Sequence, residues 1–187
     1  MLPDSFELPC VATAVFVLHY VFVDTFAVGA ARTPYQLKYP FTTETEDPKK
    51  LEPFIRALRA QQNQVEQAWA FFLAMWVCAF ALDPVFAGGC GCVWVVARMA
   101  YGYIYRVNPS RNKLMYATVP AYASQAAVCG GIIAAVLPFS WPVSITCSAL
   151  AVVAFAVYGW MVYRSWFGSF VQEEKKRLEG NLLSSSE

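Results

Sequence analysis

Long apolar stretches alternate with short polar breaks along most of the 187 residues. A helix needs about 20 consecutive apolar residues to cross the ~30 Å hydrocarbon core of a bilayer. Stretches of this length occur at 8–31, 84–105, 114–137 and 141–163. A shorter one at 65–82 continues backwards to Pro53, a residue well suited to a first helical turn. The pattern therefore predicts an all-α integral membrane protein with five spans.

The polar breaks between these spans are only a few residues long, as at Asp83-Pro84 and at 108–110. Short connections are typical of antiparallel neighbours in a helical bundle. We therefore expect one transmembrane domain over residues 1–170, followed by a charged, disordered cytosolic tail at 171–187. The first stretch is interpreted as a retained span rather than a signal peptide, because acidic residues precede it and its apolar run is long.

The basic residues predict the orientation. Under five spans, 13 of the 14 Lys and Arg residues fall on one side of the membrane, and Arg98 is the exception. The positive-inside rule makes that side cytosolic. The amino terminus is then lumenal and the carboxyl terminus cytosolic. In a four-span alternative, 141–163 lies on the membrane surface and the basic tail becomes lumenal, so the rule favours five.

Composition narrows the functional classes. The chain is 58% hydrophobic and 14% charged, whereas soluble domains have about 45–50% apolar and about 25% charged residues. A net charge of +1 gives no electrostatic basis for nucleic-acid binding. The six cysteines are too scattered for a disulfide-stapled domain. With His19 as the single histidine, no metal site is expected.

Polar residues inside a span cost several kcal/mol unless paired, so they are candidates for function. Helical spacing places Arg59, Asn63 and Glu66 on one face of the second helix. The same spacing places Arg98, Tyr101 and Tyr105 on one face of the third span. Both stripes rise toward the predicted cytosolic side.

Guanidiniums, a carboxylate, an amide and phenols together suit a small zwitterionic peptide with two carboxylates and one amine. If that peptide carries a thiol, a nearby guanidinium lowers the thiol pKa from about 8.5 toward neutrality and creates a nucleophile. A purely structural alternative also exists. Arg98 and Glu66 could form an ion pair between helices, with the tyrosines as an interfacial belt.

Two short motifs carry a family resemblance. They are Arg59-Ala-Gln-Gln-Asn63-Gln-Val-Glu66 and Ala97-Arg98-Met-Ala-Tyr101-Gly-Tyr-Ile-Tyr105, supported by Ala30-Ala31-Arg32 and Pro40-Phe-Thr-Thr. They resemble MAPEG proteins (membrane-associated proteins in eicosanoid and glutathione metabolism), nearest the microsomal glutathione S-transferase and leukotriene-C synthase branch. The similarity covers 28–137. It implies a four-helix transmembrane bundle, to which 141–163 adds a fifth span.

The resemblance implies a homotrimer in endoplasmic-reticulum-type membranes, with glutathione bound between subunits near the cytosolic side. The implied catalytic residue is Arg111, which would stabilise the glutathione thiolate, with Arg106 as the rival. The implied glutathione contacts are Arg32, Arg59, Gln61, Asn63, Glu66, Arg98, Tyr101 and Tyr105.

The expected function is a membrane-bound glutathione transferase that attacks lipophilic electrophiles, with peroxidase activity toward lipid hydroperoxides as an extension. The partners are then glutathione, the electrophile or hydroperoxide, and membrane lipids. The alternatives are a non-catalytic lipid-binding or scaffold member of the same fold and a purely structural membrane protein. Retention of Arg111 with the whole polar stripe favours the enzyme.

Other polar and small residues are interpreted as structural. His19 and Asp24 lie five residues apart, so we expect them not to stack on one face of a regular helix. Asp24 is predicted to be a satisfied polar contact that faces the bundle or a neighbouring subunit. Cys90 and Cys92, in the glycine-rich run 88–92, could be a redox pair, but we expect small residues there to let helices pack closely.

Overall fold

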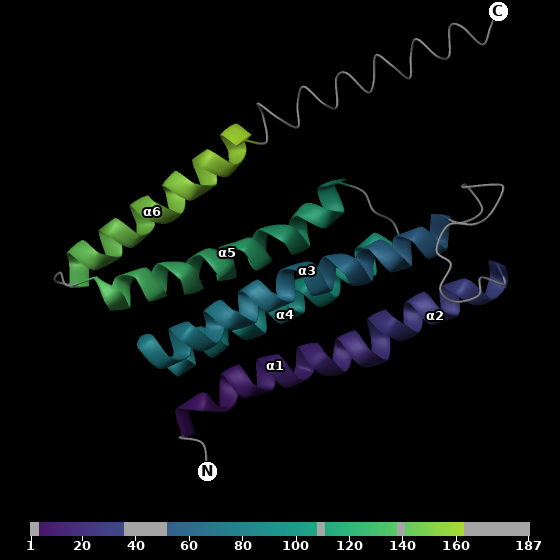
Figure 1. Cartoon of the computed structure of the whole chain (residues 1–187), viewed down its shortest axis with the longest axis horizontal. Coiled ribbons are helices and arrows are strands. Elements are labelled where there is room, and N and C mark those ends of the chain that lie inside the picture. The colour runs from purple at the N-terminus through teal and green to yellow at the C-terminus, as the bar shows by residue number, and fades with distance from the viewer. Residues whose placement is uncertain (1–3, 36–51, 108–110, 138–140, 163–187) are drawn as a thin grey trace, which may run out of the picture. The chain divides into compact units, whose positions relative to one another are not determined.

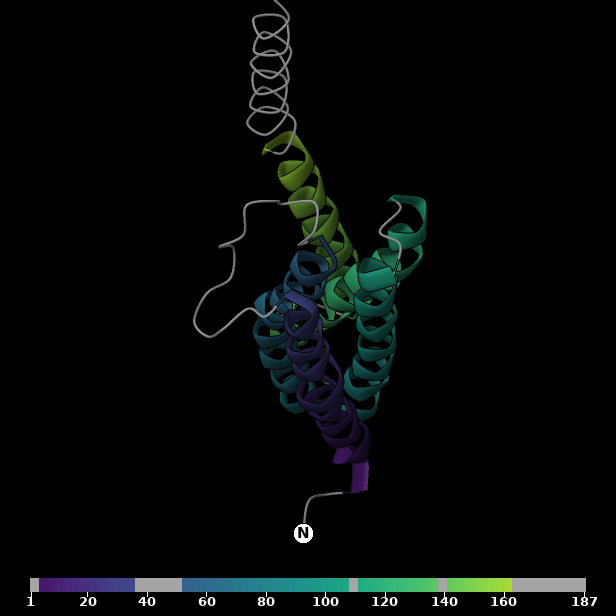
Figure 2. The same ribbon diagram turned by 90° about the vertical axis from the view of Figure 1, so that its right-hand side faces the viewer.

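The structure is a computed structural model that describes residues 4–35, 52–107, 111–137 and 141–162. The chain forms two units, Met1–Pro138 and Phe139–Glu187. Helices of the first unit run side by side in both perpendicular views (Figures 1 and 2). The second unit contributes α6, Trp141–Val162. The predicted tail at 171–187 lies outside the described residues.

The first long helical rod joins three helical segments between two 3-10 turns. A 3-10 turn at Asp4–Phe6 leads into α1, Glu7–His19, then into a π-helical segment, η2, Tyr20–Thr25, and then into α2, Phe26–Arg32. The Thr25 hydroxyl donates to the Tyr20 carbonyl at 3.0 Å, which bridges the five-residue spacing of the π-turn. A second 3-10 turn, Thr33–Tyr35, follows.

The next helices are α3, Glu52–Ala81, and α4, Pro84–Val107. Asp83 caps α4, because its Oδ1 accepts a 2.6 Å hydrogen bond from the Phe86 N–H. The last helix of the unit is α5, Arg111–Val136. α4 contacts α1, α3 and α5, so it is the central helix of this unit.

Within the described residues, four helical stretches are long and apolar enough to cross a membrane: Glu7–Arg32, Glu52–Ala81, Pro84–Val107 and Lys113–Val136. The predicted all-α membrane fold is confirmed. A fifth span at α6 stays a prediction.

Aromatic rings and small residues hold the first unit together. Phe71 of α3 stacks on Trp94 of α4 with ring centroids 4.3 Å apart, and Phe16 of α1 packs against Trp94 at 5.6 Å. Gly88 and Gly91 are buried where α4 meets other helices. The expectation that small residues permit close packing here is therefore confirmed at these two glycines.

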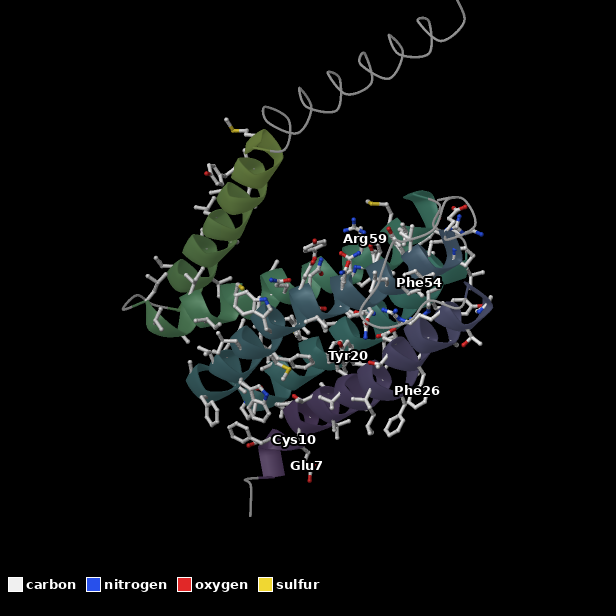
Figure 3. All side chains as sticks on the ribbon, turned by 45° about the vertical axis from the view of Figure 1, so that its right-hand side comes forward. Glu7, Cys10, Tyr20, Phe26, Phe54 and Arg59 are labelled. Atoms are coloured by element: carbon white, nitrogen blue, oxygen red, sulfur yellow. The ribbon has the colours of Figure 1, made fainter. Side chains whose placement is uncertain are left out.

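Large apolar side chains also cover the outside of the helices. Phe26, Trp69, Phe80 and Tyr116 are exposed. Phe26 points away from the other helices in Figure 3, whereas Tyr20 lies on the side of its rod that faces α3. Such an apolar exterior suits contact with lipid or with another membrane protein rather than with water.

Candidate functional site

The polar stripe of α4 forms a compact cluster. Arg98 is only 2% exposed, and its guanidinium carbon lies 4.6 Å from the Tyr101 ring centre. The Tyr101 and Tyr105 rings stack with centroids 5.7 Å apart. Three of the residues selected from the sequence therefore share one face and touch in series. Stacking over an aromatic ring favours a cation in this low-dielectric setting.

Arg98 is held by α3 through neutral groups. Its Nε donates to Gln64 Oε1 at 3.0 Å, and its Nη2 donates to the Asn63 carbonyl at 2.7 Å. Gln64 Nε2 in turn donates to the Arg98 carbonyl at 2.7 Å. This reciprocal pair, the Gln64–Arg98 clamp, fixes the guanidinium without a counter-charge. Among the described side chains, no carboxylate forms an ion pair with Arg98.

The α3 stripe is placed differently. Arg59 and Glu66 are exposed, and Asn63 is half-buried. Arg59 is visible at the edge of α3 in Figure 3. The Arg98–Glu66 ion pair considered from the sequence is not formed, because the Arg98 guanidinium binds Gln64 and the Asn63 carbonyl instead. Within one chain, Arg59 and Glu66 therefore face outward.

A small hollow lies between η2 and α3, with a volume of about 220 Å³. Its walls include Tyr20, Gln61 and Glu66. Gln61 Nε2 donates to Thr25 Oγ1 at 3.2 Å and to the Tyr20 hydroxyl at 3.5 Å. This hollow brings two predicted contacts, Gln61 and Glu66, next to a phenol that the sequence analysis did not select.

The remaining predicted arginines lie at helix ends. Arg32 ends α2 and is buried, with its guanidinium carbon 5.0 Å from the Phe54 ring centre. Arg111 is the first residue of α5, and its side chain lies outside the described residues. The rival Arg106 points into the bundle, where it forms an ion pair with Asp24. Arg106 is therefore already committed to a carboxylate.

One interpretation from the sequence was wrong. His19 Nδ1 lies 3.3 Å from Asp24 Oδ2, although the two residues are five apart. The π-helical segment η2 explains the contact, because a π-turn brings residues i and i+5 together. Regular helical spacing, on which the expectation rested, does not apply there. The buried Gln64 and the half-buried Tyr20 were also missed, since neither follows a repeated polar spacing.

These features define a helical membrane protein whose polar residues cluster around a buried guanidinium. The MAPEG family model matches residues 9–137. The chain belongs to the MAPEG family, and the resemblance found in the motifs is confirmed.

Individual relatives match over shorter segments. An uncharacterised protein of Synechocystis sp. is 36% identical over 97 residues, which is 52% of this chain and 66% of the relative. Microsomal glutathione S-transferase 2 from Bos taurus and that from Homo sapiens are each 33% identical over 78 residues, 42% of this chain and 49% of each relative. The chain thus spans about half to two thirds of the length of the curated relatives it matches.

Proposed function

We propose that the protein is a membrane-bound glutathione transferase. The observation that carries this is the buried guanidinium of Arg98, which stacks on Tyr101 and has no carboxylate partner among the described side chains. An unpaired cation inside a membrane protein is costly unless a ligand completes it. Glutathione offers two carboxylates and an ammonium. The similarity to two microsomal glutathione S-transferases supports the same ligand.

The proposed chemistry is thiolate formation followed by nucleophilic attack. The glutathione thiol releases its proton to water, and Arg111 stabilises the thiolate at the start of α5, where the helix N-terminus also favours a negative charge. The sulfur then bonds to an electrophilic carbon and displaces the leaving group. With a lipid hydroperoxide, two glutathiones are instead oxidised to a disulfide while the hydroperoxide becomes an alcohol and water. No metal takes part in this scheme.

The site proposed for glutathione combines Arg32, Arg59, Gln61, Asn63, Glu66, Arg98, Tyr101 and Tyr105. Arg59 and Glu66 face outward in one chain, so we propose that a neighbouring subunit of a homotrimer covers them. We further propose an endoplasmic-reticulum-type membrane, with the amino terminus lumenal and the α4–α5 connection cytosolic.

The test is conjugation of glutathione to an aryl halide by the purified protein, run beside reduction of a lipid hydroperoxide. Arg59→Ala and Glu66→Ala should weaken glutathione binding at least tenfold, since each removes a charged contact. Arg56→Ala is the matched control, because Arg56 forms an exposed pair with Glu52 on the same helix. Unchanged glutathione affinity in both site variants would refute the site.

Ultraviolet difference spectroscopy tests the role of Arg111. Addition of glutathione should produce a thiolate band, and Arg111→Ala should abolish it. Lys113→Ala removes an exposed cation two residues away on the same helix and should leave the band intact. A band of full height in Arg111→Ala would remove Arg111 from the mechanism.

A second candidate function is lipid binding without catalysis. It is favoured by an apolar cleft of about 480 Å³ between α4 and α5, whose walls include Val93, Val96, Ala100, Ile104, Ala117 and Pro120. A cleft of this size and lining can hold an acyl chain. The aryl halide assay separates the candidates, because a binding protein would take up lipid and glutathione yet form no conjugate.

A further inference from the structure

A carboxylate lies fully buried in the first helical rod. Asp24 is 0% exposed and forms an ion pair with Arg106 of α4 through Oδ1. Its Oδ2 lies 3.3 Å from His19 Nδ1, and neither of these two atoms has a hydrogen-bond partner within the described residues. An acidic side chain within a membrane span costs several kcal/mol. Packing alone therefore does not account for a carboxylate at this position.

The backbone is shaped to bring these groups together. The π-helical segment η2 turns Asp24 toward α4, and such segments are frequent at functional sites. Opposite it, α4 has Gly102. A Cβ there would lie 2.9 Å from Gln64 Nε2, 3.5 Å from Asp24 Oδ1 and 3.7 Å from Arg106 Nη2. Polar groups from three helices thus converge where α4 lacks a side chain.

This convergence connects the buried ion pair to the candidate site. Gln64, which borders the Gly102 position, is the side chain that holds Arg98. Arg106 directly follows Tyr105, the last residue of the α4 stripe. The Asp24–Arg106 pair therefore lies behind the stripe, with Gln64 between it and Arg98. A change in the charge or position of this pair should therefore alter the electrostatic environment and the placement of Arg98, Tyr101 and Tyr105.

We propose that Asp24 is a positioning residue for the glutathione site: by neutralising and anchoring Arg106 it fixes the C-terminal turn of α4 and keeps a second guanidinium away from the thiolate. The proposal rests on the proposed transferase function. It assigns stabilisation of the glutathione thiolate to Arg111 alone, because the charge of Arg106 is neutralised by Asp24 within the bundle.

The proposal predicts the direction in which the pKa of the bound glutathione thiol shifts when either partner of the pair is removed. The intact pair has no net charge, whereas loss of one partner leaves a full charge about one helix diameter, ~10 Å, from the stripe. At that distance and an effective dielectric constant of about 20–40, a unit charge shifts a pKa by about half to one unit.

The experiment is an ultraviolet titration of the thiol of bound glutathione in Asp24→Asn, Arg106→Gln and the double variant. Asp24→Asn leaves Arg106 unpaired, so the thiol pKa should fall by about half to one unit. Arg106→Gln leaves the negative charge of Asp24 unpaired, so the thiol pKa should rise by a similar amount. The double variant should return to the wild-type value.

A residue that only stabilises the fold would give a different outcome. Variants that keep the wild-type oligomeric state and the wild-type thiol pKa would overturn the proposal. Asp24→Glu keeps the negative charge and should keep the wild-type pKa, whereas a shift as large as that of Asp24→Asn would also overturn it. Should Asp24→Asn not fold, Arg106→Gln against the double variant still measures the effect. Absence of any thiolate band in the wild type would instead refute the proposed function itself.

Discussion

The contact between α1 and α4 gives a sharp prediction at Gly88. A Cβ at this position would lie 2.4 Å from Leu8 Cβ and 2.6 Å from the Pro9 backbone nitrogen. Backbone cannot rotate away, so Gly88→Ala must push α1 off α4. Overpacking of this kind costs about 1–3 kcal/mol, and alanine returns about 1 kcal/mol through its higher helix propensity.

The neighbouring Gly89 is the matched control, because a Cβ there meets nothing within 4 Å. Gly89→Ala should gain about 0.5–1 kcal/mol in unfolding free energy. The propensity term is common to both substitutions and cancels in their difference. That difference therefore measures the packing cost alone, and we expect about 1–3 kcal/mol, with Gly88→Ala the less stable.

The assay is reversible denaturant unfolding of each variant in detergent micelles, followed by tryptophan fluorescence. Trp94, one of the six tryptophans of the chain, is fully buried in the core that α1 and α4 share, so its contribution to the emission changes when these helices separate. Equal unfolding free energies for Gly88→Ala and Gly89→Ala would refute the predicted approach of α1 to α4.

Two further predictions concern stability. Gln64→Leu removes the side-chain partner of Arg98 and should destabilise the protein by about 1.5–3 kcal/mol, the cost of a lost hydrogen bond to a buried charged group, measured by the same unfolding assay. Gln67→Leu is the control, because Gln67 makes an exposed contact with Tyr122, and it should change the unfolding free energy by less than about 1 kcal/mol. Equal losses of stability in the two variants would contradict the Gln64–Arg98 clamp. Asp83→Ala removes the cap of α4 and should cost about 0.5–2 kcal/mol. Asp83→Asn keeps an accepting oxygen and should recover most of this loss, whereas an Asn variant as unstable as Ala would argue against the cap.

The helices were predictable because the membrane imposes a length on each apolar run. The predicted 84–105 and 114–137 correspond to Pro84–Val107 and Arg111–Val136. Two local features were not predictable. The pattern of apolar and polar residues over Tyr20–Thr25 does not distinguish this π-helical segment from a regular α-helix. The glycine-rich run indicates close packing, yet only the three-dimensional contacts distinguish Gly88 from Gly89.

The candidate site was predictable in part. Helical periodicity alone placed Arg98, Tyr101 and Tyr105 on one face, and the structure brings their side chains into contact. Periodicity describes only one helix at a time. The partners that complete the cluster come from other helices, such as Gln64, which is 34 positions away from Arg98. Nothing in the run around Gln64 separates it from its glutamine neighbours.

The arrangement of buried charges in the first unit favours an anionic ligand at the proposed site. Asp24 and Arg106 form an ion pair, so together they carry no net charge. Arg98 is held by an amide and a carbonyl, which satisfy its hydrogens but leave its charge. Neutral partners therefore preserve the attraction for an incoming carboxylate, whereas an acidic partner would have removed it. A Gln64→Glu variant should fold with Arg98 paired and lose affinity for glutathione.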